Sequence, residues 1–88
     1  MAIEFNVSKS GANRKKHGVS FSEAQAVLFD PLAVTIEDLS AIGERRYVTV
    51  GLASSGELLV VVYAERNRGY RLISARKATP KERKTYES

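Results

Sequence analysis

Apolar and polar residues alternate over residues 3–7, "IEFNV", and this pattern predicts a short N-terminal strand. The polar segment behind it predicts a helix with Ser8 as its N-cap, closed by His17 and Gly18, because glycine is the residue type most often found just past a helix end. The basic residues and the histidine in the last turn of this helix suit the negative end of its dipole.

A second helix is predicted to begin after Ser20. Glu23 follows Ser20 by three residues, which is the spacing of a capping box. Pro31 disfavours helix at Asp30, so this helix should end there. The residues that share its apolar face are Phe21, Ala24, Val27 and Leu28.

From residue 32 the pattern changes to strands separated by short turns. The segment 57–65, "ELLVVVYAE", is apolar at both alternating positions, so we expect a central strand that is covered on both faces. Thr79, Pro80 and Glu82 occupy the N-cap, first and capping-box positions of a short polar helix. The predicted strands are 32–38, 45–53, 57–65 and 70–76, with tight turns at 54–56 and 66–69.

The predicted order of elements is therefore β-α-α-β-β-β-β-α. Helices that are separate from a run of strands are typical of an α+β fold. We expect an antiparallel sheet, with the apolar faces of the two N-terminal helices packed on one side and a short C-terminal helix, in a single domain over 1–88. The other face of the sheet is then free to carry polar chemistry.

Composition excludes several kinds of chemistry. The chain has no cysteine, which excludes disulfides, thiolate metal sites and thiol nucleophiles. One histidine and scattered carboxylates form no metal-ligand spacing, so we expect neither a metal nor a cofactor. The longest apolar run, 58–64, is too short to cross a bilayer, and we expect a cytoplasmic protein with no membrane partner.

The net charge of +4 is unevenly distributed along the 88 residues. Residues 1–17 hold four basic residues and one acid, residues 18–65 hold two basic residues and seven acids, and residues 66–88 hold eight basic residues and two acids. If the two basic ends meet in the fold, they favour a polyanionic partner. Otherwise they solvate two terminal helices.

Arginines and acids gather on the predicted strands. Strict alternation places Arg71 and Arg76 on opposite faces of their strand, and Arg46 begins another strand beside Glu44. Cleavage of RNA without a metal needs a base, an acid and cations for the charge on the phosphorane, and arginine matches phosphate oxygens bidentately. The candidate acids and bases are Lys16, His17, Glu44, Tyr63 and Glu65.

These features also have purely structural explanations. Arginine–glutamate pairs at strand ends are commonly surface ion pairs worth about 0–1 kcal/mol. A lone histidine at a helix C-terminus is more often a residue that stabilises the dipole than a catalyst. Most of the aromatic residues should be core or rim residues, and those placed to stack on a base are Tyr63, Tyr70 and Tyr86.

Several motifs in combination resemble one family. They are "N-x-x-K-H-G-V-S-F-x-E-A" from Asn13, "D-P" at 30–31, "E-x-R" from Glu44, "LLVVVYAER" at 58–66 and "RLISARKATPKERKTYE" at 71–87. In this order and spacing the chain resembles the BrnT family of type II toxin–antitoxin toxins over essentially its whole length. The resemblance implies a RelE-like fold and a ribonuclease that cuts RNA without metal and inhibits translation. It also implies a hetero-oligomer with a DNA-binding antitoxin of the BrnA type, which neutralises the toxin and represses the operon.

The resemblance also implies that several sheet arginines are needed for toxicity. We expect Arg46, Arg71 and Arg76 to hold phosphate and stabilise the transition state, with His17 or Glu44 transferring protons. The residues expected to bind RNA are Lys16, Arg66, Tyr63 and Tyr86. The chain departs from the family at 5–6, where Phe-Asn replaces an aromatic–Asp pair, and in the loop 38–43, where a histidine found in many relatives is absent.

Two other hypotheses stay open. One is a non-catalytic, degenerate toxin-like module that binds a protein partner or nucleic acid in operon autoregulation, since phosphate binding alone needs only cations. The other treats the C-terminal helix as an antitoxin-docking or dimer element. Acids beside the arginines hinder pure phosphate binding, and this favours the ribonuclease.

Overall fold

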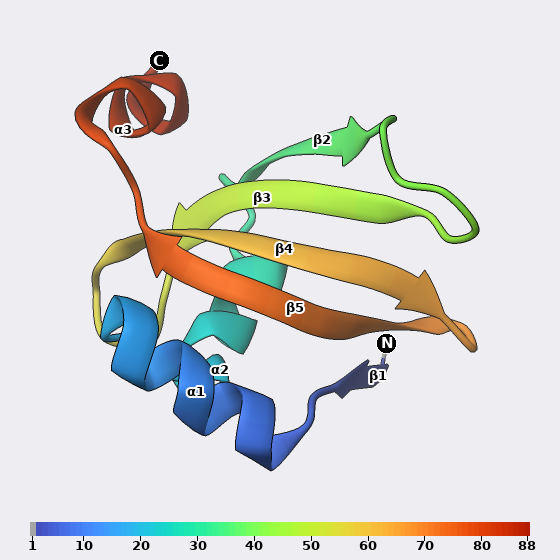
Figure 1. The fold of residues 1–88 in the computed structure, drawn as a ribbon. Helices are drawn as coiled ribbons and strands as arrows, with labels where there is room; N and C mark the ends of the chain where they lie inside the picture. The colour runs from blue at the N-terminus through green and yellow to red at the C-terminus, as the bar shows by residue number, and fades with distance from the viewer. Residues whose placement is uncertain (1) are drawn as a thin grey trace.

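The computed structural model describes residues 2–88 as a five-stranded sheet with helices on both sides (Figure 1). The predicted order of strands and helices is confirmed, except that the second helix continues as a separate 3-10 helix, η1. The elements are β1 (Ala2–Glu4), α1 (Val7–His17), α2 (Phe21–Ala24), η1 (Gln25–Phe29), β2 (Val34–Asp38), β3 (Arg46–Leu52), β4 (Leu58–Arg66), β5 (Gly69–Lys77) and α3 (Pro80–Glu87).

The sheet is mixed, so the prediction of an antiparallel sheet was wrong for one pair of strands. The strand order is β1-β5-β4-β3-β2, and β2 to β5 form an antiparallel meander. β1, in contrast, pairs in parallel with the start of β5. No hairpin joins these two strands, so chain connection does not force them to run in opposite directions. Gly69 permits the pairing, because a Cβ there would collide with the carbonyl group of Ala2.

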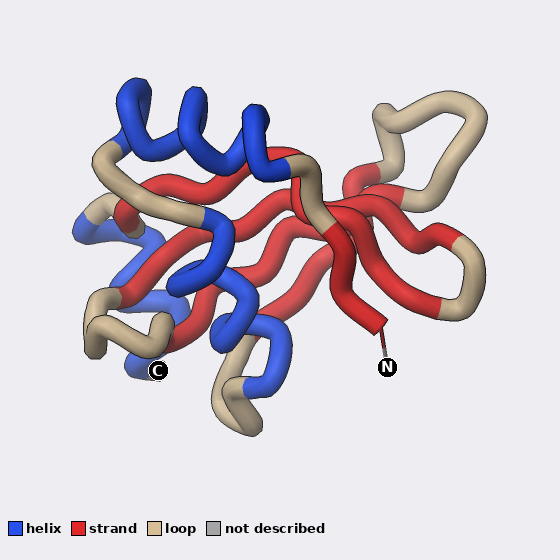
Figure 2. The backbone as a smooth tube through the Cα atoms, turned by 90° about the horizontal axis from the view of Figure 1, so that it is seen from below, coloured by secondary structure: helices blue, strands red, loops and turns tan. Residues whose placement is uncertain are grey.

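The helical layer made by α1, α2 and η1 covers one face of the sheet (Figures 1 and 2). β4 is the middle strand and is buried over most of its length, which confirms the prediction of a central strand. Six of the largest fully buried apolar side chains come from this helical layer and from the sheet face beneath it, namely Val19, Phe21, Val27, Leu59, Val61 and Leu72. A seventh, Val60, lies on the other face of the sheet.

α1 packs through polar side chains rather than through the apolar face that we expected. Its two buried residues are Ser10 and Asn13. The Ser10 hydroxyl accepts a hydrogen bond from the backbone N–H of Phe21 at 2.9 Å, which ties the start of α2 to α1. The N-cap of α1 is Asn6 rather than Ser8, because the Asn6 side chain accepts the Lys9 N–H at 3.2 Å.

The other predicted helix ends are confirmed. Gly18 closes α1 with φ of 75°, in the left-handed region that favours glycine. Ser20 and Glu23 form the capping box of α2, and Thr79 and Glu82 form that of α3. Since these signals act over three or four residues, the sequence alone was enough to locate them.

We call the sheet face that points away from α1 and α2 the open face. α3 lies over this face near β3, as Figure 1 shows, and the Tyr86 hydroxyl donates to Oδ2 of Asp30 at 2.6 Å. No helix within residues 2–88 has the length and apolar character needed to cross a membrane. By strand register the open face carries Val34, Ile36, Asp38, Arg46, Val48, Val50, Val60, Val62, Ala64, Arg71, Ser74 and Arg76.

Candidate functional site

A carboxylate between two arginines lies at one end of the open face. Nε of Arg46 donates to Oε2 of Glu44 at 2.8 Å, and Nη2 of Arg71 approaches Oε1 of Glu44 at 3.5 Å. Glu44 comes from the loop before β3, whereas the two arginines come from β3 and β5. The hydrogen bond from Arg46 and the nearby charges of Arg46, Arg71 and Arg66 hold the pKa of Glu44 below its usual value. Glu44 is therefore a carboxylate at neutral pH, among cations suited to a phosphate.

A β-bulge in β5 brings Arg71 to this cluster. Val62 pairs with Ser74 but the next residue, Tyr63, pairs with Leu72, so that Ile73 is an extra residue in β5. The predicted alternation is therefore wrong beyond Ile73. Arg71 and Arg76 lie on the same face of the sheet, next to their partners on β4, Ala64 and Val60. Leu72 and Ala75 both point into the core.

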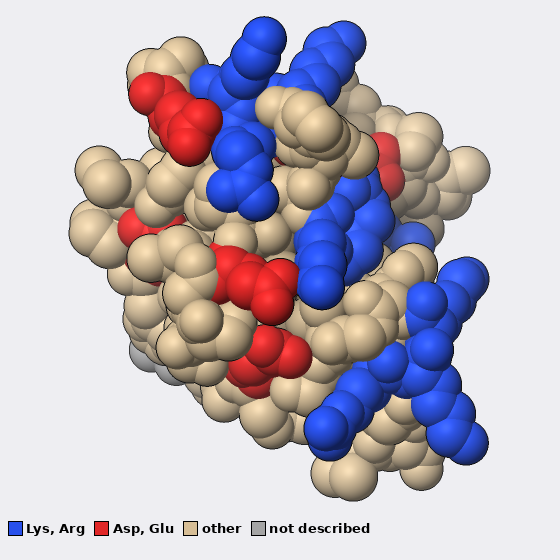
Figure 3. Space-filling model, turned by 90° about the vertical axis from the view of Figure 1, so that its left-hand side faces the viewer, with Lys and Arg blue, Asp and Glu red and all other residues tan. Residues whose placement is uncertain are grey.

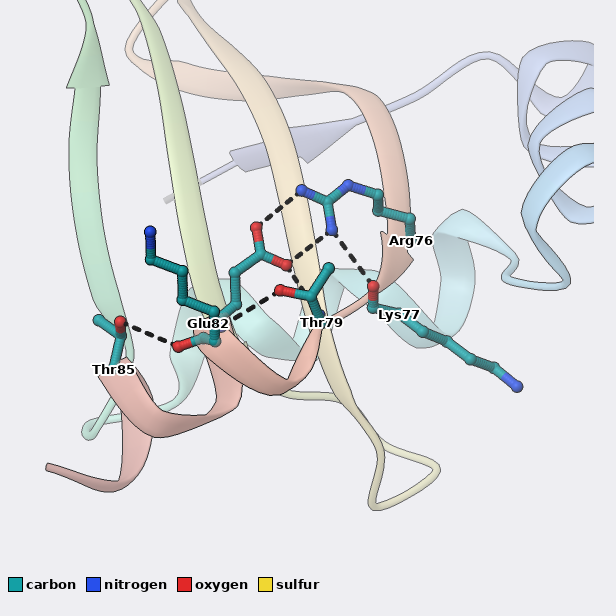
Figure 4. A network of polar contacts seen from close by, with 6 residues as sticks. Arg76, Lys77, Thr79, Glu82 and Thr85 are labelled. Atoms are coloured by element: carbon teal, nitrogen blue, oxygen red, sulfur yellow. Dashed lines mark hydrogen bonds and ion pairs between the residues drawn. The ribbon is translucent and has the colours of Figure 1, made fainter.

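Arg76 lies at the other end of the open face and forms a separate ion pair. Its Nη1 and Nη2 atoms donate to the two carboxylate oxygens of Glu82, each at 2.8 Å (Figure 4). These hydrogen bonds lower the pKa of Glu82 to about 2 and raise the pKa of Arg76. Arg71 pairs with Ala64 and Arg76 pairs with Val60, so the two arginines lie four residues of β4, or about 13 Å, apart along the sheet. The structure therefore does not bring Arg76 to Glu44.

His17 and Lys16 lie in an open cleft of about 320 Å³ between α1 and the bulge of β5. His17 is half-buried and Lys16 is exposed. Ser74, which shares this cleft, lies on the open face between Arg71 and Arg76. His17 therefore lies at the β5 edge of the open face, in a cleft that Glu44, Arg46 and Arg71 do not line. The cleft is lined by Lys9, Ala12, Asn13, Lys16, His17, Ile73 and Ser74.

Asn13 holds α1 against β5 beside this cleft, and it was not among the residues predicted for the site. Its Nδ2 donates to the carbonyl oxygens of Ala75 and Val19, both at 2.8 Å, and its Oδ1 accepts the N–H of Ala75 at 3.2 Å. The amide thus completes the edge of β5 just past the bulge, as a neighbouring strand would. Lys16 and His17 follow Asn13 by three and four residues, which places all three on one side of α1. This spacing was the signal available in the sequence.

The aromatic candidates occupy different environments. Tyr63, expected to stack on a base, is instead a core residue with 6% of its surface exposed, and its hydroxyl hydrogen-bonds to Oγ1 of Thr49. Its ring stacks on Tyr47 and meets Tyr70 edge to face, so no face is open to a base. Tyr86 is half-buried and holds α3 to Asp30. Arg66 is exposed at the end of β4, near Glu44.

The two basic ends of the chain share one side of the molecule. Figure 3 shows Lys and Arg side chains over α3, over the end of β5 and over α1, on the side that lies at the left in Figure 1. Among residues 2–88, no group of three or more His, Asp or Glu side chains is arranged to hold a metal ion. The basic residues of these three segments are Arg14, Lys15, Lys16, Arg76, Lys77, Lys81, Arg83 and Lys84.

Comparison with known families decides the identity of the chain. The sequence profile of the ribonuclease toxin BrnT, of type II toxin–antitoxin systems, matches residues 5–82. The chain belongs to the BrnT family. No curated protein matches it.

The BrnT profile spans both ends of the open face and the α1 cleft. It includes Glu44, Arg46 and Arg71, together with His17 and the Arg76–Glu82 pair. Tyr86 alone among the candidate residues lies beyond the matched segment. The family also implies a protein antitoxin as a partner.

Proposed function

We propose that this BrnT protein cleaves RNA without a metal, by attack of a 2′-hydroxyl on the adjacent phosphate. The proposed site is the Glu44 cluster, which consists of Glu44, Arg46 and Arg71. The observation that carries the proposal is the contact of one carboxylate with arginines from two strands on the open face of the sheet. The side chains of Arg46 and Arg71 are 42% and 32% exposed, so a phosphate can reach both.

In this mechanism the phosphate takes over the N–H groups that now bind Glu44. The freed carboxylate accepts the proton of the 2′-hydroxyl, and the 2′-oxygen forms a bond to phosphorus. Arg46 and Arg71 stabilise the extra negative charge of the phosphorane. The bond to the 5′-oxygen then breaks, and that oxygen leaves with a proton. The products are a 2′,3′-cyclic phosphate and a 5′-hydroxyl.

The remaining candidates act on the leaving group and on the neighbouring phosphates of the RNA. His17, in the cleft at the β5 edge, is our candidate for the group that protonates the 5′-oxygen. Lys16, Arg66 and Arg76 are cations for neighbouring phosphates, since they border the cluster or the open face.

In the cell, cleavage of RNA inhibits translation, and we infer that the protein acts in the cytoplasm. An antitoxin of the BrnA type binds the toxin, neutralises it, and represses the operon through its DNA-binding part. We expect the next open reading frame to encode this antitoxin.

The deciding experiment incubates the purified chain with end-labelled RNA, with and without EDTA. We expect cleavage in both conditions and 2′,3′-cyclic phosphate ends on the products. Growth arrest on expression of the chain alone, relieved by co-expression of the neighbouring reading frame, tests the cellular role. Intact RNA after incubation with folded protein, together with harmless expression, would refute the proposal.

A further inference from the structure

β2 forms an open edge of the sheet. It is last in the strand order, and in the chain from residue 2 to residue 88 no strand pairs with its outer side. A free edge presents a row of backbone N–H and C=O groups on which another extended chain can pair. The other end of the order does not offer a comparable edge, because β1 is three residues long and Asn13 completes the edge of β5.

Exposed apolar side chains gather along this edge. Of the seven large hydrophobic residues that are exposed within residues 2–88, six lie on β2, just before it, in the loop after it, or at the neighbouring end of β3. Their exposed fractions run from 43% to 96%. The seventh is Val7, at the start of α1. The six residues, which we call the β2 edge cluster, are Phe29, Leu32, Ile36, Leu39, Ile42 and Leu52.

An apolar cleft adjoins the cluster on the open face. It has a volume of about 180 Å³ and runs between α3 and the strands. Ile36 belongs both to this cleft and to the exposed edge, so the two surfaces are continuous. A strand added beside β2 could therefore place one aliphatic side chain in the cleft. The lining residues are Val34, Ile36, Val48, Val50, Glu82 and Thr85.

Charge identifies the class of molecule that fits here. The segment 29–42 contains three acids, Asp30, Glu37 and Asp38, and no lysine or arginine. Negative charge repels phosphates, so this edge is unsuited to the RNA that the basic side of the molecule attracts. A second copy of the chain would bring two such acidic segments together, which is also unfavourable. A different protein with an aliphatic segment need not carry the negative charge that disfavours both RNA and a second copy of the chain at this edge.

We propose that the antitoxin docks on this edge by adding an extended, aliphatic segment to β2 and covering the β2 edge cluster. The inference rests on the proposed function, in which a protein antitoxin neutralises this chain. Hydrogen bonds between the backbones of β2 and the antitoxin segment align the two chains. Apolar side chains of the antitoxin pack against Ile36, Leu39 and Ile42 and bury their exposed surface.

Docking at this edge also reaches the proposed catalytic cluster. Leu39 and Ile42 lie in the loop that leads to Glu44, and Asp38 stands opposite Arg46 in the sheet. An antitoxin segment that covers this loop therefore lies next to the Glu44 cluster, where it hinders the approach of RNA. Neutralisation and docking thus involve the same end of the open face.

The test uses full-length Ile36→Lys and Ile42→Lys variants and the purified product of the neighbouring reading frame. Both side chains are exposed, so the substitutions should not unfold the protein, and thermal melting checks this. We expect each variant to bind the antitoxin about tenfold or more weakly, because charge is placed where apolar surface is buried. Val7→Lys is the matched control, since Val7 is 80% exposed and follows β1, which lies at the opposite end of the strand order from β2. The affinity of this variant for the antitoxin should change by less than about twofold.

Other outcomes distinguish the inference from its premise. Wild-type affinity in both lysine variants, together with unchanged amide exchange of residues 34–38 on antitoxin binding, would overturn the docking proposal and leave the ribonuclease intact. A wild-type chain that binds no antitoxin would remove the premise and the docking proposal together. If the isolated chain is a dimer that Ile36→Lys makes monomeric, the edge belongs to a second copy and our assignment is wrong.

Discussion

Arg71 and Arg76 project from the same face of β5, although five positions separate them along the strand. In a regular strand an odd separation places two side chains on opposite faces. The extra residue Ile73 restores the common face, and the two arginines then bind different carboxylates, Glu44 and Glu82. The bulge thus gives one strand two separate anionic partners on the open face.

Replacing an arginine of the Glu44 cluster should remove activity without unfolding the protein. We expect Arg46→Ala or Arg71→Ala to lower kcat/KM for RNA cleavage by about 10²–10³, because in the proposed mechanism each guanidinium stabilises the charge of the phosphorane. Thermal stability should hardly change, since exposed ion pairs contribute about 0–1 kcal/mol. The matched control is Arg45→Ala, which removes the adjacent, exposed arginine near Glu37 and Tyr47. An equal loss in the Arg45 variant would mean that general charge, rather than the cluster, drives catalysis.

Glu44→Gln should separate catalysis from binding. We expect kcat to fall by about 10²–10⁴ because the base is lost. Affinity for an RNA with a 2′-deoxy group at the cleavage site should stay the same or rise, because a negative charge has left the phosphate site. In the free enzyme the pKa of Glu44 lies below its usual value of 4.5, so its protonation should not reduce the wild-type kcat/KM between about pH 5 and 7.

The control for this variant is Glu57→Gln, which breaks an exposed pair with Lys77 at 3.6 Å and should leave kcat unchanged. Undiminished cleavage by Glu44→Gln would show that another group is the base.

The Arg76–Glu82 pair should make the free energy of unfolding depend on pH in the acidic range. The pKa of Glu82 is about 2 in the folded protein and near 4.5 when the chain is unfolded, so the unfolded state binds the proton more readily. The stabilisation is therefore complete above about pH 4.5 and is lost as the pH falls toward 2. At pH 7 we expect Glu82→Gln to lower the free energy of unfolding by roughly 1–2 kcal/mol.

Unfolding of the wild type and of Glu82→Gln, measured from pH 7 to pH 2, checks this expectation. The difference between them should shrink only below about pH 4.5. A constant difference over the whole range would show that the capping role of Glu82, rather than its charge, accounts for the loss.

Asn13 should contribute more to stability than its position on a polar helix indicates. Asn13→Ala leaves the N–H and C=O of Ala75 and the carbonyl of Val19 without this partner in a buried place, so we expect a loss of about 2–4 kcal/mol. Asn6→Ala, which removes the N-cap of the same helix, should cost only about 1 kcal/mol. Chemical denaturation of both variants measures the two losses. If both variants lost the same free energy of unfolding, the hydrogen bonds of Asn13 to Ala75 and Val19 would contribute no more than an ordinary helix cap.

Helix ends and turns were predictable because each depends on a few neighbouring residues. Ser20 with Glu23 and Thr79 with Glu82 close their capping boxes within four residues, and Gly18 supplies a left-handed φ by itself. The exception is instructive, since Asn6 rather than Ser8 caps α1 and both residue types make good caps.

The candidate site was predictable only in part. The pairing of Arg46 with Glu44 follows from their separation of two residues, and the structure confirms that they are in contact. Tyr63 could not be assigned from the pattern, because β4 is apolar on both faces and alternation does not tell which face the helices cover. Its burial follows from the packing of α2 and η1 on that face.

The sequence by itself determined the N-caps of α2 and α3, the C-cap of α1, the order of the strands and α-helices and the central place of β4, because caps, turns and hydrophobic runs are local properties of the chain. Only the tertiary structure decided that β1 runs parallel to β5, that Ile73 forms a bulge and that Arg71 joins Glu44 while Arg76 joins Glu82. The physical reason is that strand direction, register and ion pairing depend on partners distant in sequence. A shift of one residue in that pairing moves a whole set of side chains to the other face.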